Sequence, residues 1–79
     1  MKVRINGAKN IEITGEYIKL DALLKYASVV STGGEAKAMI QDGKVFVGGA
    51  LCTVRGKKIK PGDIVRHRCG VLLVRQAEE

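Results

Sequence analysis

The spacing of the apolar residues changes at Lys19, and this change limits the folds open to the chain. Upstream, "KVRI" (residues 2–5) and "NIEIT" (residues 10–14) alternate apolar with polar residues, which is typical of short strands. A turn signal, Asn6-Gly7, separates them, so the second segment is a candidate partner of the first. Downstream, helical spacing takes over at Leu20, Leu23, Leu24 and Ala27. The sequence therefore predicts strands first and a helix of about two turns next.

The segment "STGGEAK" (residues 31–37) predicts a second helix. Thr32 and Glu35 fit a capping box, in which the hydroxyl accepts from the Glu35 amide and the carboxylate accepts from the Thr32 amide. The helix is therefore expected to begin at Gly33 and to end before Gly43, which suits a left-handed residue just past a helix. Its expected buried stripe is Ala36, Met39 and Ile40.

Strand-like alternation returns after Gly43. Gly48-Gly49 suits a tight hairpin turn with positive φ angles, and Pro61-Gly62 signals a type II turn. The expected strands are residues 45–47, "ALCTV" (50–54), "IVRHR" (64–68) and "VLLVR" (71–75), the last two joined at a Cys69-Gly70 turn. The expected class is α+β, with two short helices packed on a small antiparallel sheet and an N-terminal strand extension.

The length of 79 residues predicts a single domain over residues 1–79, with little room for a catalytic cleft. Because hydrophobic residues make up 46% and aromatic residues only 4%, the core is expected to be mostly aliphatic. The two cysteines form no disulfide framework, and the N-terminal residues lack the apolar centre of a secretory signal. No apolar run approaches the ~18 residues of a membrane helix. We therefore expect a cytoplasmic protein without a membrane partner.

The charge balance points to a polyanionic partner. Fourteen Lys and Arg against eight Asp and Glu give a formal net charge of +6. A small body with this charge attracts polyanions over about a Debye length, ~8 Å at physiological salt. Nucleic acid is the leading partner class and an anionic membrane surface is the second. A basic surface that is merely solvated remains open, and clustering of the charges on one side would decide between these interpretations.

The glycines and lysine of "STGGEAK" do not form a nucleotide site. A P-loop needs G-x-x-x-x-G-K-[ST] between a strand and a helix, whereas here Glu35 and Ala36 separate Gly34 from Lys37 and a helix precedes the loop. The start of the second helix could hold a single phosphate or could simply be capped. Asp21 and Asp63 stand at a helix start and a turn, where carboxylates are structurally common. We therefore expect no enzyme, no catalytic residue and no cofactor.

The soft metal ligands are too few for a structural zinc site. They are Cys52, His67 and Cys69. The last two lie two positions apart and would share one face of a strand, but such a site usually has four ligands with tighter pairing. A packed cysteine and a surface histidine are the expected roles, and no metal is expected.

Taken together, "IKLDALLKYASVVSTGGEAKAMIQDGKVFVGG…KIKPGDIV" resembles the S-four-type RNA-binding domain, named for ribosomal protein S-four and also called the αL motif. The resemblance covers a motif core of residues 19–65 and looks most like the small stand-alone bacterial members. Its elements are Lys19-Leu20-Asp21, Thr32 to Ala36, Ile40 to Gly49 and Gly62 to Val65. The chain departs from the family pattern at Gly33, where an arginine is usual, and at Gly48, where an asparagine is usual.

The resemblance implies that RNA lies across the two helices and the following β-hairpin, held mainly through its phosphates. The residues that carry this role by position are Lys19, Lys25, Thr32, Lys37, Gln41, Lys44, Arg55, Lys57 and Lys58. Tyr17 and Tyr26 could stack on bases or be partly buried.

The expected function is a noncatalytic, monomeric module that binds structured RNA, ribosomal or tRNA-like, by shape and backbone. The alternative is a protein-interaction adaptor on a ribosome or nucleoprotein assembly.

Overall fold

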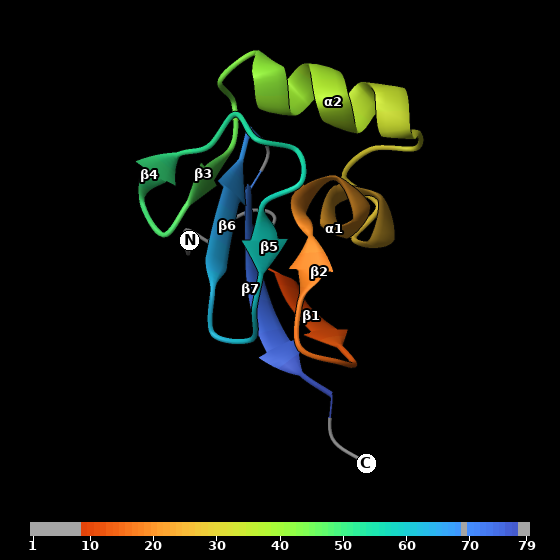
Figure 1. Ribbon diagram of the computed structural model, residues 1–79, viewed down its shortest axis with the longest axis vertical. Helices are drawn as coiled ribbons and strands as arrows, with labels where there is room; N and C mark the ends of the chain where they lie inside the picture. The colour runs from red at the N-terminus through yellow and green to blue at the C-terminus, as the bar shows by residue number, and fades with distance from the viewer. Residues whose placement is uncertain (1–8, 69, 78–79) are drawn as a thin grey trace, which may run out of the picture.

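The computed structural model describes residues 9–68 and 70–77, in which two helices lie against a twisted sheet (Figure 1). The helices are α1 (Leu20–Tyr26) and α2 (Gly33–Gln41). A five-stranded sheet has the order β1 (Lys9–Ile13), β7 (Gly70–Gln76), β6 (Ile64–His67), β3 (Phe46–Val47) and β4 (Ala50–Leu51). A two-stranded sheet pairs β2 (Ile18–Lys19) with β5 (Lys58–Ile59). The expected α+β class is confirmed.

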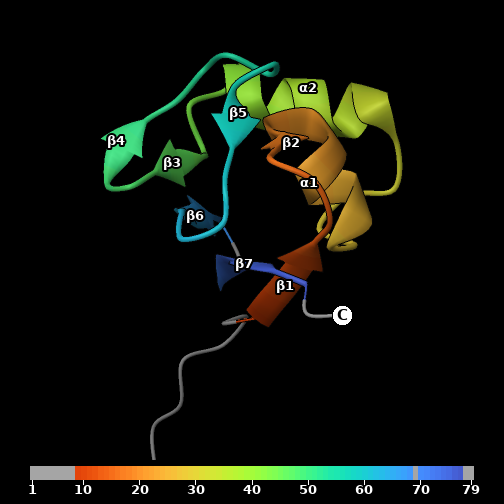
Figure 2. The same cartoon turned by 60° about the horizontal axis from the view of Figure 1, so that its bottom comes forward.

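The two helices bury the residues that their spacing predicts. In α1, the side chains of Leu20, Leu23 and Leu24 are fully buried, and Ala27 is buried just past its end. In α2, Ala36 and Ile40 are fully buried and Met39 packs at the margin of the core. Figure 2 shows both helices on one side of the five-stranded sheet. Burial of these aliphatic side chains is the main force that holds the helices to the sheet.

The capping box at the start of α2 is confirmed. The Glu35 amide donates to Thr32 Oγ1 at 3.1 Å, and Glu35 Oε1 accepts from the Thr32 amide at 3.3 Å and the Ser31 amide at 2.7 Å. These bonds satisfy amides that the helix itself leaves without a partner. At the other end, Gly43 has a φ of 76°, as expected for the left-handed residue after a helix.

Replacing Thr32 by alanine is expected to lower the free energy of unfolding by about 0.5–2 kcal/mol, because the hydroxyl that caps α2 is lost. The measurement is urea denaturation followed by circular dichroism. Thr32→Ser keeps the hydroxyl and is expected to retain most of the stability, while Ser31→Ala removes a neighbouring hydroxyl that takes no part in the box. An unchanged midpoint for Thr32→Ala would contradict the role of this cap.

The hairpin between β3 and β4 turns at Gly48-Gly49, as predicted. Their φ angles are 60° and 87°, which residues with a Cβ rarely adopt, so glycine is required by the turn itself. The return strand is shorter than predicted, because β4 ends at Leu51 instead of continuing to residue 54. The Arg55 and Lys57 carbonyls accept instead from the first turn of α1, which draws the chain away from the five-stranded sheet.

The sheet is mixed, whereas an antiparallel sheet was expected. The β6 and β7 strands form the predicted antiparallel hairpin, but β1 pairs in parallel with β7, from Lys9 opposite Leu72 to Ile13 opposite Gln76. This pairing puts Ile11 and Ile13 on the face that the helices cover. The alternation in "NIEIT" indicated which side chains are buried but not which strand is the partner. The expected strand over residues 2–5, the Asn6-Gly7 turn and Cys69 lie outside the described residues.

The core is aliphatic, as the composition predicts, and lies between the helices and one face of the sheet. Its buried members are Ile11, Ile13, Leu20, Leu23, Leu24, Ala27, Ala36, Ile40, Val45, Ile59, Val65, Leu72 and Val74. On the opposite face, Phe46, Leu51 and Ile64 are exposed. In the part of the chain that the structure describes, neither helix has the length and apolar character needed to cross a bilayer.

Candidate nucleic-acid interface

Four of the predicted basic residues meet at the start of α1, because β2 pairs with β5. The antiparallel register sets Lys19 opposite Lys58. Two further backbone bonds continue the ladder into the helix, from the Leu20 amide to the Lys57 carbonyl at 2.9 Å and from the Asp21 amide to the Arg55 carbonyl at 3.1 Å. This arrangement brings together Lys19, Arg55, Lys57 and Lys58, which we call the basic cluster.

Two lysines stand at directly opposite positions of the strand pair within the basic cluster. Residues directly opposite in an antiparallel pair have Cβ atoms roughly 4.5–5.5 Å apart, and like charges in such positions destabilise the pair. Lys19 and Lys58 occupy these positions, and both side chains are exposed. A phosphate beside them would be attracted by both ammonium groups. The geometry therefore favours an anionic ligand at this point of the surface.

One carboxylate lies within the basic cluster, and it is already engaged. Asp21 Oδ2 lies 3.3 Å from Arg55 Nε, and Asp21 Oδ1 accepts from the Ala22 amide at 2.8 Å. The Arg55 side chain is 49% exposed, so solvent screens this ion pair and its contribution to stability is small. The pair holds Arg55 against the helix start and leaves the three lysines to set the local charge.

The lysine Lys58 also packs over an aromatic ring. Its Nζ lies 4.9 Å from the centroid of the Tyr17 ring, a cation–π distance. Tyr17 directly precedes β2, and its side chain is 40% exposed. The basic cluster therefore borders an aromatic side chain.

The predicted residues of α2 lie apart from the basic cluster. Lys37 and Gln41 are exposed and lie one turn apart on the same flank of the helix. Glu35 and Met39 project from the opposite flank, about half a turn away. Thr32 is the cap, and its hydroxyl, having accepted from the Glu35 amide, keeps its hydrogen for a partner outside the helix.

Two predicted lysines lie elsewhere on the surface. Lys44 borders a hollow of about 360 Å³ on the Glu35 and Met39 flank of α2, together with Arg68. It is thus separated from Lys37 by the width of the helix. Lys25 is exposed in the last turn of α1, where a cation complements the helix dipole. The sequence did not predict that Arg68 lies beside Lys44. No local pattern relates the turn between β6 and β7, which carries Arg68, to α2.

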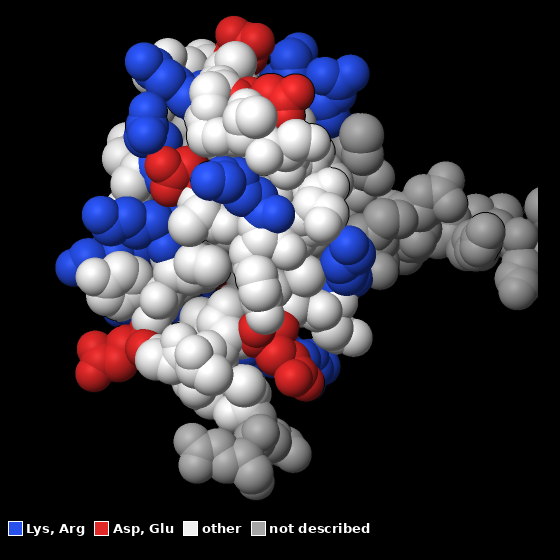
Figure 3. All heavy atoms as spheres, turned by 90° about the vertical axis from the view of Figure 1, so that its right-hand side faces the viewer, with Lys and Arg blue, Asp and Glu red and all other residues white. Residues whose placement is uncertain are grey.

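The basic side chains are gathered unevenly. In Figure 3, which looks onto the end of the molecule that carries α1, Lys and Arg are densest along the left-hand margin. This margin corresponds to the front of Figure 1, where β2 and β5 lie. Acidic side chains interrupt the basic surface at several points but do not form a continuous face in this view.

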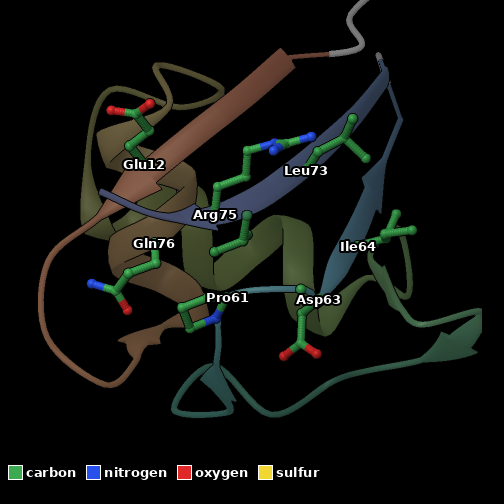
Figure 4. A pocket seen from close by; sticks show the side chains of 9 residues that line it. Glu12, Pro61, Asp63, Ile64, Leu73, Arg75 and Gln76 are labelled. Atoms are coloured by element: carbon green, nitrogen blue, oxygen red, sulfur yellow. The ribbon is translucent and has the colours of Figure 1, made fainter. Parts of the chain in front are cut away.

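A hollow of about 500 Å³ lies on the opposite face of the sheet (Figure 4). The carboxylates of Glu12 and Asp63 point away from each other at its two ends. Asp63 Oδ2 accepts from the Lys60 amide at 2.8 Å, and Arg75 Nε donates to Asn10 Oδ1 at 3.1 Å. These side chains serve the local structure, and the hollow offers no paired carboxylates for acid–base chemistry.

The candidate soft ligands do not gather. Within residues 9–68 and 70–77, no three His, Cys, Asp or Glu side chains come together as a metal site would require. Cys52 is half-buried at the margin of the core, and its Sγ lies 3.6 Å from the Val54 carbonyl oxygen. Burial, with a smaller contribution from the Lys9 charge, lowers the pKa of His67 below its usual value of 6.5. Cys69, the expected neighbour of His67, lies outside the described residues.

Comparison with known proteins identifies the family. The family model described as "S4 domain" matches residues 11–74 and so extends beyond both ends of the expected motif core. The chain is 38% identical over 58 residues to the "Probable ribosome maturation protein RlbA" of Bacillus subtilis, a match that covers 73% of this chain and 82% of that protein.

A second relative is much longer. The chain is 38% identical over 50 residues to the "Small ribosomal subunit protein uS4" of Hyphomonas neptunium, which covers 63% of this chain. The chain spans about a quarter of the length of that relative, 24%. The family model covers most of this chain and confirms the resemblance read from the motifs. The chain therefore belongs to the S4 domain family.

Proposed function

We propose that this chain is a noncatalytic module that binds structured RNA in the cytoplasm and acts on the ribosome or its RNA. The observation that carries the proposal is the basic cluster, in which Lys19 and Lys58 lie directly opposite each other on the surface. Two like charges in these positions repel each other in the free protein. A bound anion relieves that repulsion and accepts charge-assisted hydrogen bonds from both lysines. A backbone that presents repeated phosphates is the natural polyanion for such a surface.

The family and the relatives also support a role in binding ribosomal RNA. The names of both relatives refer to the ribosome, one as a subunit protein and one as a maturation protein. We take ribosomal RNA as the ligand on this basis. Phosphate contacts fix the position and orientation of the protein on the RNA but carry little information about the bases.

The flank of α2 that carries Lys37 and Gln41 extends the proposed surface. Lys25, in the last turn of α1, and Thr32, the cap of α2, also belong to the proposed surface, and each has a donor available for a phosphate. Lys44 is the weakest member, because it lies on the other flank of α2 beside Glu35. We therefore place the strongest contacts at the basic cluster and weaker ones on the helices.

A protein-interaction adaptor remains the second candidate function. The observation in its favour is the sheet face opposite the helices, where Phe46 and Leu51 form an exposed cross-strand pair and Ile64 is 47% exposed. In that case the basic cluster would only aid solubility. The two candidates differ in whether affinity for RNA depends on the position of the charges.

The test is a salt titration with a single lysine removed. Lys58→Ala is expected to flatten the plot of log K against log salt by about 0.7–0.9, the value of one lost phosphate contact, and to weaken binding roughly 5–8-fold at 0.1 M salt. Arg75→Ala removes the same charge from β7 on the other side of the sheet and is expected to change the slope much less. Equal losses for both variants would indicate diffuse attraction, and absence of binding by the unaltered protein at low salt would favour the adaptor.

A further inference from the structure

A third hollow, of about 460 Å³, opens beside the basic cluster. Its lining is mainly apolar and includes Ile13, Tyr17, Ile18, Ala22, Tyr26 and Ala77. The volume falls within the ~300–1,000 Å³ of sites that take small organic groups. The two tyrosines come from different elements, one before β2 and one at the end of α1.

Both tyrosine side chains are exposed and yet held in place. Tyr26 is 61% exposed, and its hydroxyl donates to the Glu12 carbonyl at 3.0 Å. Tyr17 is 40% exposed, and Lys58 Nζ lies over its ring. Exposed aromatic rings leave apolar area in water, and fixing them beforehand reduces the entropy that a ligand must remove on binding. These are the properties of a preformed stacking site.

The charges around the hollow suggest how a ligand would be oriented. Lys58 contacts Tyr17 and stands opposite Lys19, so positive charge lies on the β2 side. Glu12 also lines the hollow, where its backbone carbonyl accepts from the Tyr26 hydroxyl and holds that ring at the rim. A nucleotide therefore fits with its phosphate at the basic cluster and its base in the hollow.

We propose that this hollow receives one unpaired base of the bound RNA, packed against the aromatic wall that Tyr17 and Tyr26 form together, while the adjoining phosphates lie on Lys19 and Lys58. The proposal rests on the RNA-binding function and adds to it a preference for a bulge or loop beside a paired stem. Unstacked bases of this kind are the part of a structured RNA that aromatic side chains recognise. Phosphate contacts alone would bind paired RNA equally well.

The experiment compares two short RNA duplexes that differ by one bulged nucleotide. The protein has two tyrosines and no tryptophan, so its intrinsic fluorescence reports on the walls of the hollow alone. The bulged RNA is expected to quench this emission and to bind more tightly than the paired duplex. Tyr17→Leu and Tyr26→Leu are each expected to weaken binding of the bulged RNA about tenfold, within the range measured for loss of base stacking, and to leave affinity for the paired duplex within about twofold, as expected when phosphate contacts are kept.

Conservative variants separate stacking from structure. Tyr17→Phe keeps the ring and is expected to bind the bulged RNA like the unaltered protein, whereas Phe46→Leu changes an exposed ring on the opposite sheet face and is expected to have no effect. Denaturation midpoints check that each variant is folded.

The outcomes distinguish this inference from the function on which it rests. If both RNAs bind equally and the tyrosine variants change nothing, the hollow is not a base site, while the RNA-binding function stands. If neither RNA binds, both fail. Adenosine monophosphate is titrated separately: saturable quenching as tight as that by the bulged RNA would identify a free nucleotide as the occupant and overturn the proposal.

Discussion

The triple variant Lys19→Ala, Lys57→Ala, Lys58→Ala is expected to lose about two to three orders of magnitude in RNA affinity at 0.1 M salt. Each phosphate contact contributes roughly 0.7–0.9 to the slope of log K against log salt, so three contacts together account for a slope of about 2–3. Their loss should also flatten the salt dependence by the same amount. The measurement is a fluorescence anisotropy titration with a labelled, structured RNA over a range of salt concentrations.

The control variant removes equal charge from other positions. Arg66 lies on β6, Arg75 on β7 and Lys9 on β1, all away from the start of α1. Their triple replacement by alanine also removes three charges from the formal +6 of the chain. We expect it to lower affinity far less than the lysine variant does. If the two triple variants bind equally weakly, net charge and not the basic cluster determines binding.

Replacing Leu24 by alanine is expected to lower the free energy of unfolding by about 2–5 kcal/mol. The side chain is fully buried in the core, and the substitution removes apolar contacts and leaves a cavity. A domain of this size has a total stability of roughly 4–12 kcal/mol, at 0.05–0.15 kcal/mol per residue. The loss is therefore a large fraction of the whole, and the measurement is the denaturation midpoint and slope in urea.

The same substitution at an exposed leucine is the control. Leu51 is 56% exposed at the end of β4, so Leu51→Ala is expected to change stability by only about 0.5 kcal/mol or less. Comparable losses for the two variants would mean that the helix does not bury Leu24 as the structure has it.

The parts of the fold that depend on neighbouring residues could be predicted from the sequence. The start of α2 follows from Thr32 and Glu35, and the β3–β4 turn follows from two glycines, because the interactions that stabilise them lie within a few residues. The parallel pairing of β1 with β7 could not be predicted, since alternation defines a buried face and is the same for every partner strand.

In the candidate site too, the residues themselves could be predicted, but the contacts between distant segments could not. The basic residues could be identified from composition and motif, but the pairing of Lys19 with Lys58 could not, because two-residue strands are too short to show a period. Lys37 and Lys44 are near in sequence, but Lys37 lies on one flank of α2 and Lys44, past the end of the helix, borders the hollow beside the other flank. The hollow between Tyr17 and Tyr26 is formed by segments that no local signal relates.

The pairing of β1 with β7 sets the order in which the domain can fold during its synthesis. Ile13 and its partner Gln76 are 63 residues apart, so β1 waits roughly 3–13 s for β7 at synthesis rates of ~5–20 residues per second. Until then the apolar face of β1 lacks its neighbouring strand and the core stays open. By contrast, all four residues of the basic cluster have been synthesised once Lys58 has been added to the chain. A nascent chain on the ribosome therefore carries all four of these cations before the domain that fixes their positions can close.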